Sequence, residues 1–419
     1  MASEQMSQLN ISLLQIVMVL VTVRMVGWLF QRMGQSIVVG EMIAGLLLGP
    51  SLYGRLAPAA FAFTYPADSM DVLFTLSRLG VWLFMFLVGA ELDLSIVKQA
   101  GRLVVITSQF GILLPLLMGS ALSFLLYPSF AGQGIPLMSF ALFMGVSMSV
   151  TAFPVLARIL RERSMTTTEL GSTAIACAAL NDITAWCLLA VTVLFIHPAS
   201  REITMLYRLA ALLAYFAFMW LAARPLLRRM VEKQSDFTPE TFGLLLVMLL
   251  ISCVTTQVIG IHALFGAFFF GVVLPKEEWL IKGLEQRLEP LIGALLLPLF
   301  FVFSGIRTNI GLISGWSQWG LCIAIISVAV AGKFFGAAVP ARLMGQSWSK
   351  ASALGALMNT RGLMELVILN VGLELNVITP TLFSMMVVMA VVTTFMTSPW
   401  LDWIVRRSGQ PLQNSATAA

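Results

Sequence analysis

Charged residues are scarce in this 419-residue sequence: Asp, Glu, Lys and Arg make up only 11% of it, against about 25% in a soluble domain. Hydrophobic residues account for 59%, and the mean hydropathy is +0.92. Because a soluble globule of this size cannot bury so many apolar side chains, the composition excludes a soluble or secreted enzyme, a coiled coil and a disordered chain. The net charge of +5 leaves no basic groove for a nucleic acid. We therefore predict an all-α polytopic membrane protein.

The sequence is also poor in residues that build metal and redox centres. It has four cysteines, all within apolar runs and without Cys-x-x-Cys spacing, and two histidines, His197 and His262, far apart in the chain. We interpret the cysteines as small buried hydrophobes. Since no nucleophile elbow, phosphate loop or metal-spaced His set is present, we expect no enzyme activity and no resident cofactor.

Apolar windows of about 20 residues, the length that crosses a bilayer, recur along the chain. Charged residues, Pro and Gly divide them into about 13 predicted transmembrane helices: 11–31, 37–55, 71–92, 103–127, 135–160, 170–196, 204–223, 241–259, 261–275, 288–306, 317–341, 350–373 and 379–405. Of the 25 Lys and Arg residues, 17 follow odd-numbered spans or lie in the C-terminal tail, and only 4 lie in the other loops. By the positive-inside rule, we expect the N-terminus outside and the C-terminus in the cytoplasm, in a bacterial inner membrane.

Two pairs of spans share a pattern. Residues 40–50 in the second span read Gly-x4-Gly followed by Pro, as do residues 266–275 in the ninth. The ends of the third and tenth spans, 83–94 and 299–310, share a glycine followed by polar residues and a final aliphatic residue. The offset of seven spans is odd, so the copies have opposite orientations, unless such Gly- and Pro-rich helices are alike by chance. Inverted repeats are typical of secondary transporters whose site lies near the bilayer midplane.

Two spans are interrupted in matching places. The fifth contains Ser149-Val150-Thr151-Ala152-Phe153-Pro154, and the twelfth contains Met358-Asn359-Thr360-Arg361-Gly362. Pro154 lacks an amide hydrogen and biases Phe153 away from helical geometry, and polar backbone is costly in lipid. We therefore expect two broken helices that cross, with oppositely charged half-helix ends brought together. An ordinary kink in the fifth span and a shortened twelfth span are the alternative. The predicted broken-helix backbone comprises Ala152, Phe153, Pro154, Asn359, Thr360 and Gly362.

Asp182 stands alone in the middle of the sixth span, with no Lys or Arg within ten residues. Burial in an apolar medium disfavours a charged carboxylate, so we expect Asp182 to exchange a proton near physiological pH. The ionised carboxylate is also a hard oxygen ligand for Na⁺ or K⁺, assisted by Asn181 and Thr151. An acid that holds either a proton or a metal cation is the minimum machinery for antiport. A purely structural role for Asp182 is the alternative.

Other ionisable residues within spans are expected to balance charge at the crossing. Lys333, in the eleventh span, either pairs with Asp182 or caps carbonyl groups of the broken helices. Glu365 follows Arg361 by four residues, a spacing that permits an ion pair on one helix. Arg78 in the third span is interpreted as a packing or snorkelling group.

Together these motifs resemble the second branch of the monovalent cation:proton antiporters, and most closely its plant-type cation/proton exchangers and their bacterial relatives. The resemblance covers nearly the whole chain and is carried by Asn181-Asp182, Thr151-Ala152-Phe153-Pro154, Gly332-Lys333-Phe334, residues 359–366 and residues 44–50. It implies the sodium/proton antiporter fold, a homodimer and an elevator-like motion. It also implies that Asp182 carries the cation and the proton.

The domain organisation implied by this resemblance has two parts. Residues 1–95 and 241–310 are expected to form a dimerisation scaffold, and residues 103–197 and 317–405 a moving transport core. Residues 204–223 are expected to form a linker helix, and residues 406–419 a short cytoplasmic tail.

The resulting functional prediction is exchange of H⁺ for Na⁺ or K⁺. Electrogenic members of this superfamily carry two adjacent aspartates, whereas Asn181 precedes Asp182 here, so we expect one-for-one, electroneutral exchange. Lys333 acting as a second proton carrier would instead make transport electrogenic. The alternatives are sodium-coupled uptake of an organic anion on the same fold and, in another class, a cation channel.

Overall fold

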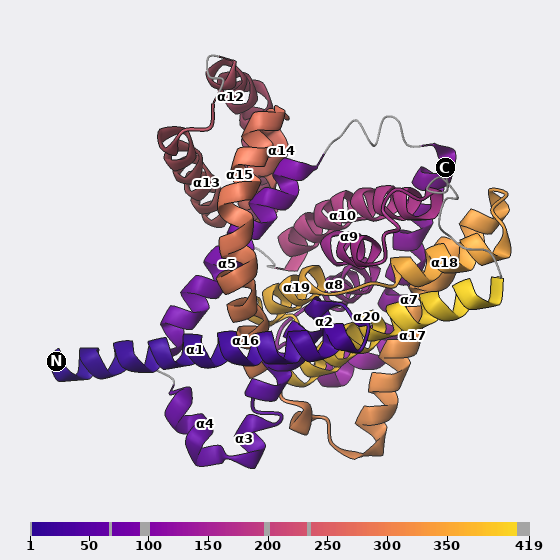
Figure 1. The fold of residues 1–419 in the computed structure, drawn as a ribbon, viewed down its shortest axis with the longest axis horizontal. Helices are drawn as coiled ribbons and strands as arrows, with labels where there is room; N and C mark the ends of the chain where they lie inside the picture. The colour runs from indigo at the N-terminus through magenta and orange to yellow at the C-terminus, as the bar shows by residue number, and fades with distance from the viewer. Residues whose placement is uncertain (1, 67–68, 93–100, 197–201, 233–235, 409–419) are drawn as a thin grey trace. The chain divides into compact units, whose positions relative to one another are not determined.

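The computed structural model describes residues 2–66, 69–92, 101–196, 202–232 and 236–408 (Figure 1). These residues form helices, and their only β-type pairing outside helices is a single bridge between Ala131 and Ile378. In lipid, a helix satisfies its backbone hydrogen bonds within one segment, which is why apolar runs of this length fold as helices. The predicted all-α class is therefore confirmed for the described part of the chain.

The helices follow one another with short connections. Their bounds are α1 (Ala2–Arg32), α2 (Ile37–Leu48), α3 (Tyr53–Leu56), α4 (Pro58–Thr64), α5 (Met70–Glu91), α7 (Arg102–Phe130), α8 (Leu137–Ser149), α9 (Phe153–Glu162), α10 (Glu169–Ile196), α11 (Glu202–Phe218), η2 (Met219–Ala223), α12 (Arg224–Val231), α13 (Pro239–Ile259), α14 (Ala263–Val273), α15 (Glu278–Leu291), η3 (Ile292–Leu296), α16 (Leu297–Arg307), η4 (Ile310–Leu312), α17 (Gly315–Leu343), α18 (Trp348–Met358), α19 (Leu363–Glu374) and α20 (Pro380–Ser408).

Each predicted span corresponds to one helix or to consecutive helical segments. Within the described residues, 11 helical segments are long and apolar enough to cross a membrane. The ninth predicted span corresponds to α14, which has only 11 residues, and the twelfth to the pair α18 and α19. The count of 13 is therefore approximate.

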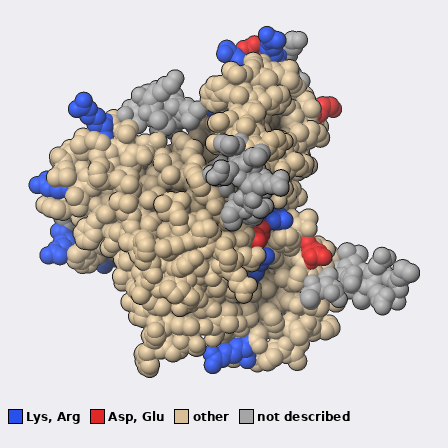
Figure 2. Space-filling view, turned by 180° about the vertical axis from the view of Figure 1, so that it is seen from behind, with Lys and Arg blue, Asp and Glu red and all other residues tan. Residues whose placement is uncertain are grey.

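On the face drawn in Figure 2, Lys, Arg, Asp and Glu gather in a few small groups, and other residues form most of the surface.

The chain forms two compact units. One comprises Met1–Ile16, Ala67–Leu94 and Ala190–Phe300, and the other comprises Val17–Pro66, Ser95–Leu189 and Phe301–Ala419. The predicted division into a scaffold and a transport core stays a prediction. Of the predicted tail, residues 409–419 lie outside the described residues, as does His197. The predicted linker helix 204–223 lies within α11 and η2.

In the first unit, α5 packs closely on α14. A side chain at Gly89 of α5 or at Gly271 of α14 would collide with the backbone of the other helix. The ammonium of Lys276 donates hydrogen bonds to the Gly89 and Ala90 carbonyl oxygens, at 2.9 and 2.6 Å. A cation at these carbonyls stabilises the negative end of α5.

The second unit contains the equivalent contact of the repeat. Gly45 of α2 and Gly305 of α16 approach so closely that a side chain on either would meet the other helix's backbone. Gly45 and Gly271 occupy the same place in the repeated Gly-x4-Gly pattern, and Gly305 and Gly89 match in the other pair. Equivalent glycines thus mediate equivalent helix contacts, which supports the predicted inverted repeat.

Three of the four cysteines are buried, as predicted, but the interpretation is wrong for Cys187, which is exposed. It lies on the outward face of α10, where a small apolar side chain can face lipid instead of protein.

Candidate functional site

Two interrupted helices form the centre of the second unit. The first interruption separates α8, which ends at Ser149, from α9, which begins at Phe153. The non-helical residues are thus 150–152, and Phe153 and Pro154 are the first two residues of α9. Proline is tolerated there because an amide in the first turn of a helix has no intrahelical partner. The second interruption separates α18, which ends at Met358, from α19, which begins at Leu363.

The two interruptions contact each other directly. The Ala152 amide donates to the Thr360 carbonyl oxygen at 3.0 Å. The Thr151 hydroxyl donates to the Met358 carbonyl oxygen at 3.1 Å. Backbone groups that leave one helix are therefore satisfied by the other, which is how polar backbone is tolerated at this depth. The broken helices cross, as the fold prediction requires.

Arg361 neutralises the end of α8. Its guanidinium donates to the carbonyl oxygens of Ser147 and Met148, at 3.1 and 2.7 Å, and these are among the last carbonyls of that half-helix. It also pairs with the Glu365 carboxylate at 2.6 Å, and both side chains are fully buried. A cation at a helix C-terminus offsets the negative end of the helix dipole. Arg361 and Glu365 thus lie at the crossing of the broken helices, and their charge-compensating role stays a prediction.

Lys333 of α17 is fully buried and contacts the first interruption. Its ammonium donates to the Thr151 hydroxyl oxygen at 2.7 Å, to the Gly111 carbonyl oxygen of α7 at 3.1 Å and to the Asn181 amide oxygen at 3.4 Å. We expected Lys333 either to pair with Asp182 or to cap carbonyl groups of the broken helices. A direct pair with Asp182 is absent from the described contacts. The lysine instead binds oxygen atoms around the break, only one of which is a backbone carbonyl.

Asp182 of α10 is only 3% exposed, and neither carboxylate oxygen has a hydrogen-bond partner among the described residues. Two groups interact favourably with its carboxylate, the Lys333 ammonium through its charge and the Phe153 backbone amide as a donor. Phe153 begins α9, so the carboxylate faces the positive end of a half-helix. A buried carboxylate without a direct ion pair is costly unless a proton or a cation neutralises it.

Asn181 and Thr151, predicted as assisting cation ligands, are already engaged. The Asn181 amide oxygen accepts from the Thr151 backbone amide at 3.2 Å as well as from Lys333. The Thr151 hydroxyl donates to a carbonyl and accepts from Lys333. These residues therefore hold the break beside Asp182 in the observed state, and their role as ligands stays a prediction.

The second interruption is held by α20. The Asn359 side-chain amide donates to the Thr393 carbonyl oxygen at 3.4 Å, and the Arg361 backbone amide donates to the Thr394 hydroxyl at 3.2 Å. Gly362 has φ +153° and ψ −130°, a region that essentially only glycine occupies. A Cβ there would lie 2.8 Å from Val155 of α9. Gly362 therefore permits both the sharp turn and the close approach of the two broken helices.

Several groups in this network were not found from the sequence. Gly111 and Met358 contribute only backbone carbonyls, and Thr393 and Thr394 look like ordinary helix threonines. No side-chain signal marks a carbonyl acceptor, so only the three-dimensional arrangement identifies these partners.

The arrangement permits one acid to bind one small cation at a time. Among the described residues, no group of three His, Cys, Asp or Glu side chains is placed to share a metal ion. A cation at Asp182 would thus complete its shell with hydroxyl, carbonyl or water oxygens, which suits a weakly held alkali ion better than a transition metal. A proton on Asp182 would remove the charge that attracts such a cation, so the two would compete for this side chain.

The sequence matches a known protein family. The family model described as "Sodium/hydrogen exchanger, transmembrane" matches residues 18–407. The Na(+)/H(+) antiporter NhaS4 of Synechocystis sp. is 39% identical over 391 residues, which are 92% of this chain and 95% of that protein.

Longer relatives match as well. Cation/H(+) antiporter 19 of Arabidopsis thaliana is 37% identical over 97% of this chain and 51% of its own length. K(+)/H(+) antiporter 1 of Saccharomyces cerevisiae is 30% identical over 94% of this chain and 46% of its own length. The chain thus spans about half the length of these two relatives.

A solved structure has the same fold. The sodium proton antiporter MjNhaP1 from Methanocaldococcus jannaschii, at pH 8, aligns with a TM-score of 0.67 over 97% of this chain and all of that one. The sequence identity is 18%, so this likeness concerns the fold alone.

Proposed function

This chain belongs to the sodium/hydrogen exchanger family, a family of membrane transporters, and from that membership we propose that it exchanges protons for Na⁺ or K⁺ across a membrane. The single observation that supports this proposal best is Asp182, a buried carboxylate that makes no direct ion pair among the described residues and lies beside two crossing broken helices. Relatives named as Na⁺/H⁺ and K⁺/H⁺ antiporters support the same class of cargo.

In the proposed cycle, the Asp182 carboxylate crosses the membrane only when a proton or a cation neutralises it. It binds a proton on one side, releases it on the other, and there takes up the cation that returns. Movement of the empty, ionised carboxylate through the low-dielectric interior is disfavoured, because an unpaired buried charge is costly. This coupling requires no second acid, so one cation is exchanged for one proton and transport is electroneutral.

Lys333 and Arg361 do not bind the cargo directly in this cycle. Both direct their hydrogen bonds to protein oxygens around the breaks, and Arg361 also pairs with Glu365. Neither guanidinium nor ammonium is therefore available to bind the carboxylate of a larger cargo, so the geometry favours a small cation over an organic anion.

We also propose how the protein assembles and moves. The transporter is a homodimer whose core moves like an elevator past a scaffold, with the N-terminus outside and the C-terminus in the cytoplasm of a bacterial inner membrane. Between α16 and α19, Asn370 donates to the Ser304 hydroxyl oxygen at 2.8 Å, and Arg307 pairs with Glu374 at 3.4 Å. Under this proposal α16 is scaffold and α19 is core, so these contacts break in each cycle.

A flux assay tests the proposed cargo. The purified protein is placed in proteoliposomes that contain a pH-sensitive dye, and Na⁺, K⁺, Li⁺ or choline is added outside. We expect internal pH to change on addition of Na⁺ or K⁺ and not on addition of choline. Proton movement independent of the cation, as through a channel, or cation entry without proton movement would contradict antiport.

A further inference from the structure

Three exposed tryptophans of the second unit each carry a stacked arginine. These Arg–Trp pairs, with the distance from the guanidinium carbon to the ring centroid, are Arg32–Trp28 at 3.8 Å, Arg342–Trp348 at 5.5 Å and Arg407–Trp403 at 5.2 Å. The three tryptophans are 52%, 62% and 55% exposed. In the first unit, Arg224 and Trp220 form a similar pair at 4.3 Å. All four distances are within the range of a cation–π interaction.

The three pairs of the second unit lie at equivalent helix ends. Arg32, Arg342 and Arg407 lie in the last turns of α1, α17 and α20. These helices are the first, eleventh and thirteenth predicted spans, so all three end on the cytoplasmic side in the proposed topology. At the opposite end of α17, Trp316 and Trp319 are 95% and 40% exposed, and no arginine stacks on either among the described contacts. The pairs therefore mark one proposed face of the membrane.

The stacking leaves the hydrogen-bond donors of these arginines available. Arg32 and Arg407 make no hydrogen bond or ion pair among the described contacts, and Arg342 donates once, to the Gln346 carbonyl oxygen at 3.0 Å. A guanidinium has five N–H donors and no acceptor, and a ring that stacks on its face leaves the N–H groups at its edge uncovered. Because stacking also orders the side chain, less rotamer entropy is lost when a ligand accepts from it.

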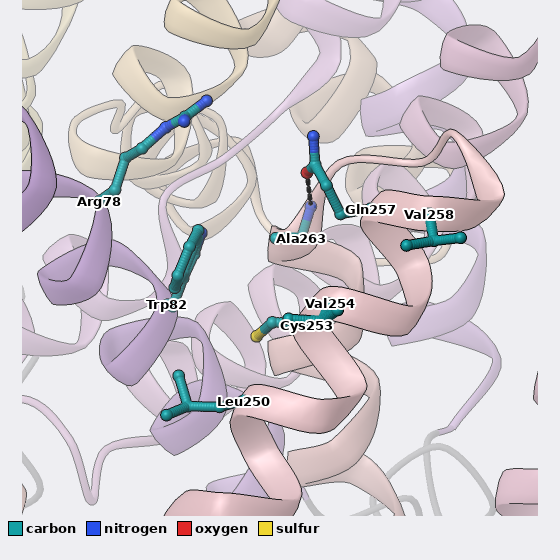
Figure 3. Close-up of a pocket in the computed structure, with 8 residues that line it drawn as sticks. All are labelled: Arg78, Trp82, Leu250, Cys253, Val254, Gln257, Val258 and Ala263. Carbon is teal, nitrogen blue, oxygen red and sulfur yellow. Dashed lines mark hydrogen bonds between the residues drawn. The ribbon is translucent and has the colours of Figure 1, made fainter.

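The arginine beside the pocket of the first unit is different. Arg78 of α5 stacks on Phe74 at 4.4 Å and lies near Trp82, where α5 faces α13 across a pocket of about 260 Å³ (Figure 3). Arg78 has further interactions within the protein, and the walls of this pocket are almost wholly apolar. An anionic ligand therefore fits the Arg–Trp pairs and does not fit this pocket.

Helix-end compensation does not by itself account for the pairs. A cation in the last turn of a helix stabilises its negative end, but this effect requires no aromatic partner. Arg406 lies beside Arg407 in the last turn of α20, is also exposed, and stacks on no ring among the described contacts. Arg406 thus supplies the same charge without the stack.

We propose that the Arg–Trp pairs bind the phosphate groups of anionic phospholipids in the cytoplasmic leaflet. Tryptophan rings are enriched at the headgroup level of a bilayer, and guanidinium binds phosphate through charge-assisted, often bidentate hydrogen bonds. Each pair thus holds a charged donor at the depth where lipid phosphates lie. The assignment concerns lipid recognition only and is independent of which ion the protein transports.

Fluorescence quenching by brominated lipids tests this proposal at Trp403. The full chain is placed in phosphatidylcholine nanodiscs that contain a small, equal mole fraction of dibromo-acyl phosphatidylglycerol or dibromo-acyl phosphatidylcholine. The Trp403 signal is the difference between each protein and the same protein with Trp403→Phe. We expect phosphatidylglycerol to bind beside Trp403 about fivefold better than phosphatidylcholine, the effect of one arginine near an anionic headgroup. Equal quenching by the two lipids, or no quenching by either, would overturn the proposal.

Two matched variants keep Trp403 as the reporter. Arg407→Gln should lower the preference for phosphatidylglycerol about fivefold, whereas Arg406→Gln should leave it unchanged. An unchanged preference in Arg407→Gln, or an equal loss in both variants, would contradict a site at the pair. Excess inorganic phosphate, added at constant ionic strength, should not remove the preference of the wild-type protein. Its removal would show that the pair binds free anions instead of lipid.

Discussion

The ammonium of Lys333 lies 2.7 Å from the hydroxyl oxygen of Thr151, so the buried lysine of α17 is bound to the break between α8 and α9. It makes no ion pair with Asp182 among the described contacts, although the two charges interact. We therefore expect the two residues to have separable roles: the lysine holds the break, and the aspartate takes up a proton or a cation.

Lys333→Gln tests this separation. Glutamine keeps one donor for the Thr151 hydroxyl but removes the charge. We expect a loss of about 1–3 kcal/mol in stability, because three oxygens lose a charged donor, and slower transport that is still electroneutral. Thermal unfolding and flux measured at imposed membrane potentials provide the readout. Voltage-stimulated transport in the wild type that disappears in Lys333→Gln would instead identify the lysine as a second proton carrier.

The Arg361–Glu365 pair is expected to be strongly non-additive. Glu365→Gln leaves a buried guanidinium without its counter-charge and should destabilise the protein by about 3–5 kcal/mol. Arg361→Met also uncaps the Ser147 and Met148 carbonyls. The double variant Arg361→Met with Glu365→Leu should be more stable than the sum of the single changes predicts, as measured by thermal unfolding. Strict additivity would show that the pair is not coupled.

The competition between proton and cation predicts a pH dependence. Where Asp182 holds a proton in the absence of cation, each unit of falling pH should raise the apparent KM for the cation by up to about tenfold, because the proton must leave first. The maximal rate should change much less. Initial fluxes at several cation concentrations and pH values measure both. A KM that is constant with pH alongside a changing maximal rate would show that the two ions use different sites.

Gly362→Ala should damage the site through the backbone. The residue adopts φ +153°, and a Cβ would press on Val155, so we expect a cost of about 1–3 kcal/mol together with reduced transport. Gly243→Ala is the matched control. Gly243 lies within α13 with open space around it, and alanine there should be neutral or stabilising by about 0.5–1 kcal/mol. Equal unfolding temperatures for the two variants would refute the argument from strain.

A reversible cross-link tests the proposed motion. The side chains of Ser304 in α16 and Asn370 in α19 are hydrogen-bonded, so cysteines at both positions can be joined by a short, reducible bis-thiol linker. If α19 moves past α16, the cross-linked double variant should lose transport and regain it on reduction. Full transport by the cross-linked protein would exclude an elevator that separates these helices.

Much of this architecture was predictable because a bilayer restricts the possible folds. The cation:proton antiporter resemblance and the antiporter-like fold are confirmed by the family match and the solved structure. The breaks at Thr151 and Thr360 could be predicted from the sequence because polar residues and proline are rare within apolar helices. The number of spans was less certain, since the predicted ninth span forms α14, which is shorter than the other candidate spans.

The detailed contacts of the site were not predictable. The sequence left Lys333 with two possible partners, and the choice depends on how α7, α10 and α17 pack together. The acceptors for Arg361 are backbone carbonyls, which every residue has and which no sequence pattern distinguishes. The exposure of Cys187 likewise follows from the rotation of α10 about its axis, which a uniformly apolar helix does not reveal.

The most direct test of the account compares Asp182→Asn with Asp71→Asn in the proteoliposome flux assay. Asparagine preserves the shape of Asp182 but neither releases a proton nor offers a charged ligand, whereas Asp71 is exposed in the first turn of α5. With both variants folded, as checked by thermal unfolding, we predict that Asp182→Asn abolishes cation-driven proton flux and that Asp71→Asn retains it. Undiminished flux in Asp182→Asn would contradict the central claim.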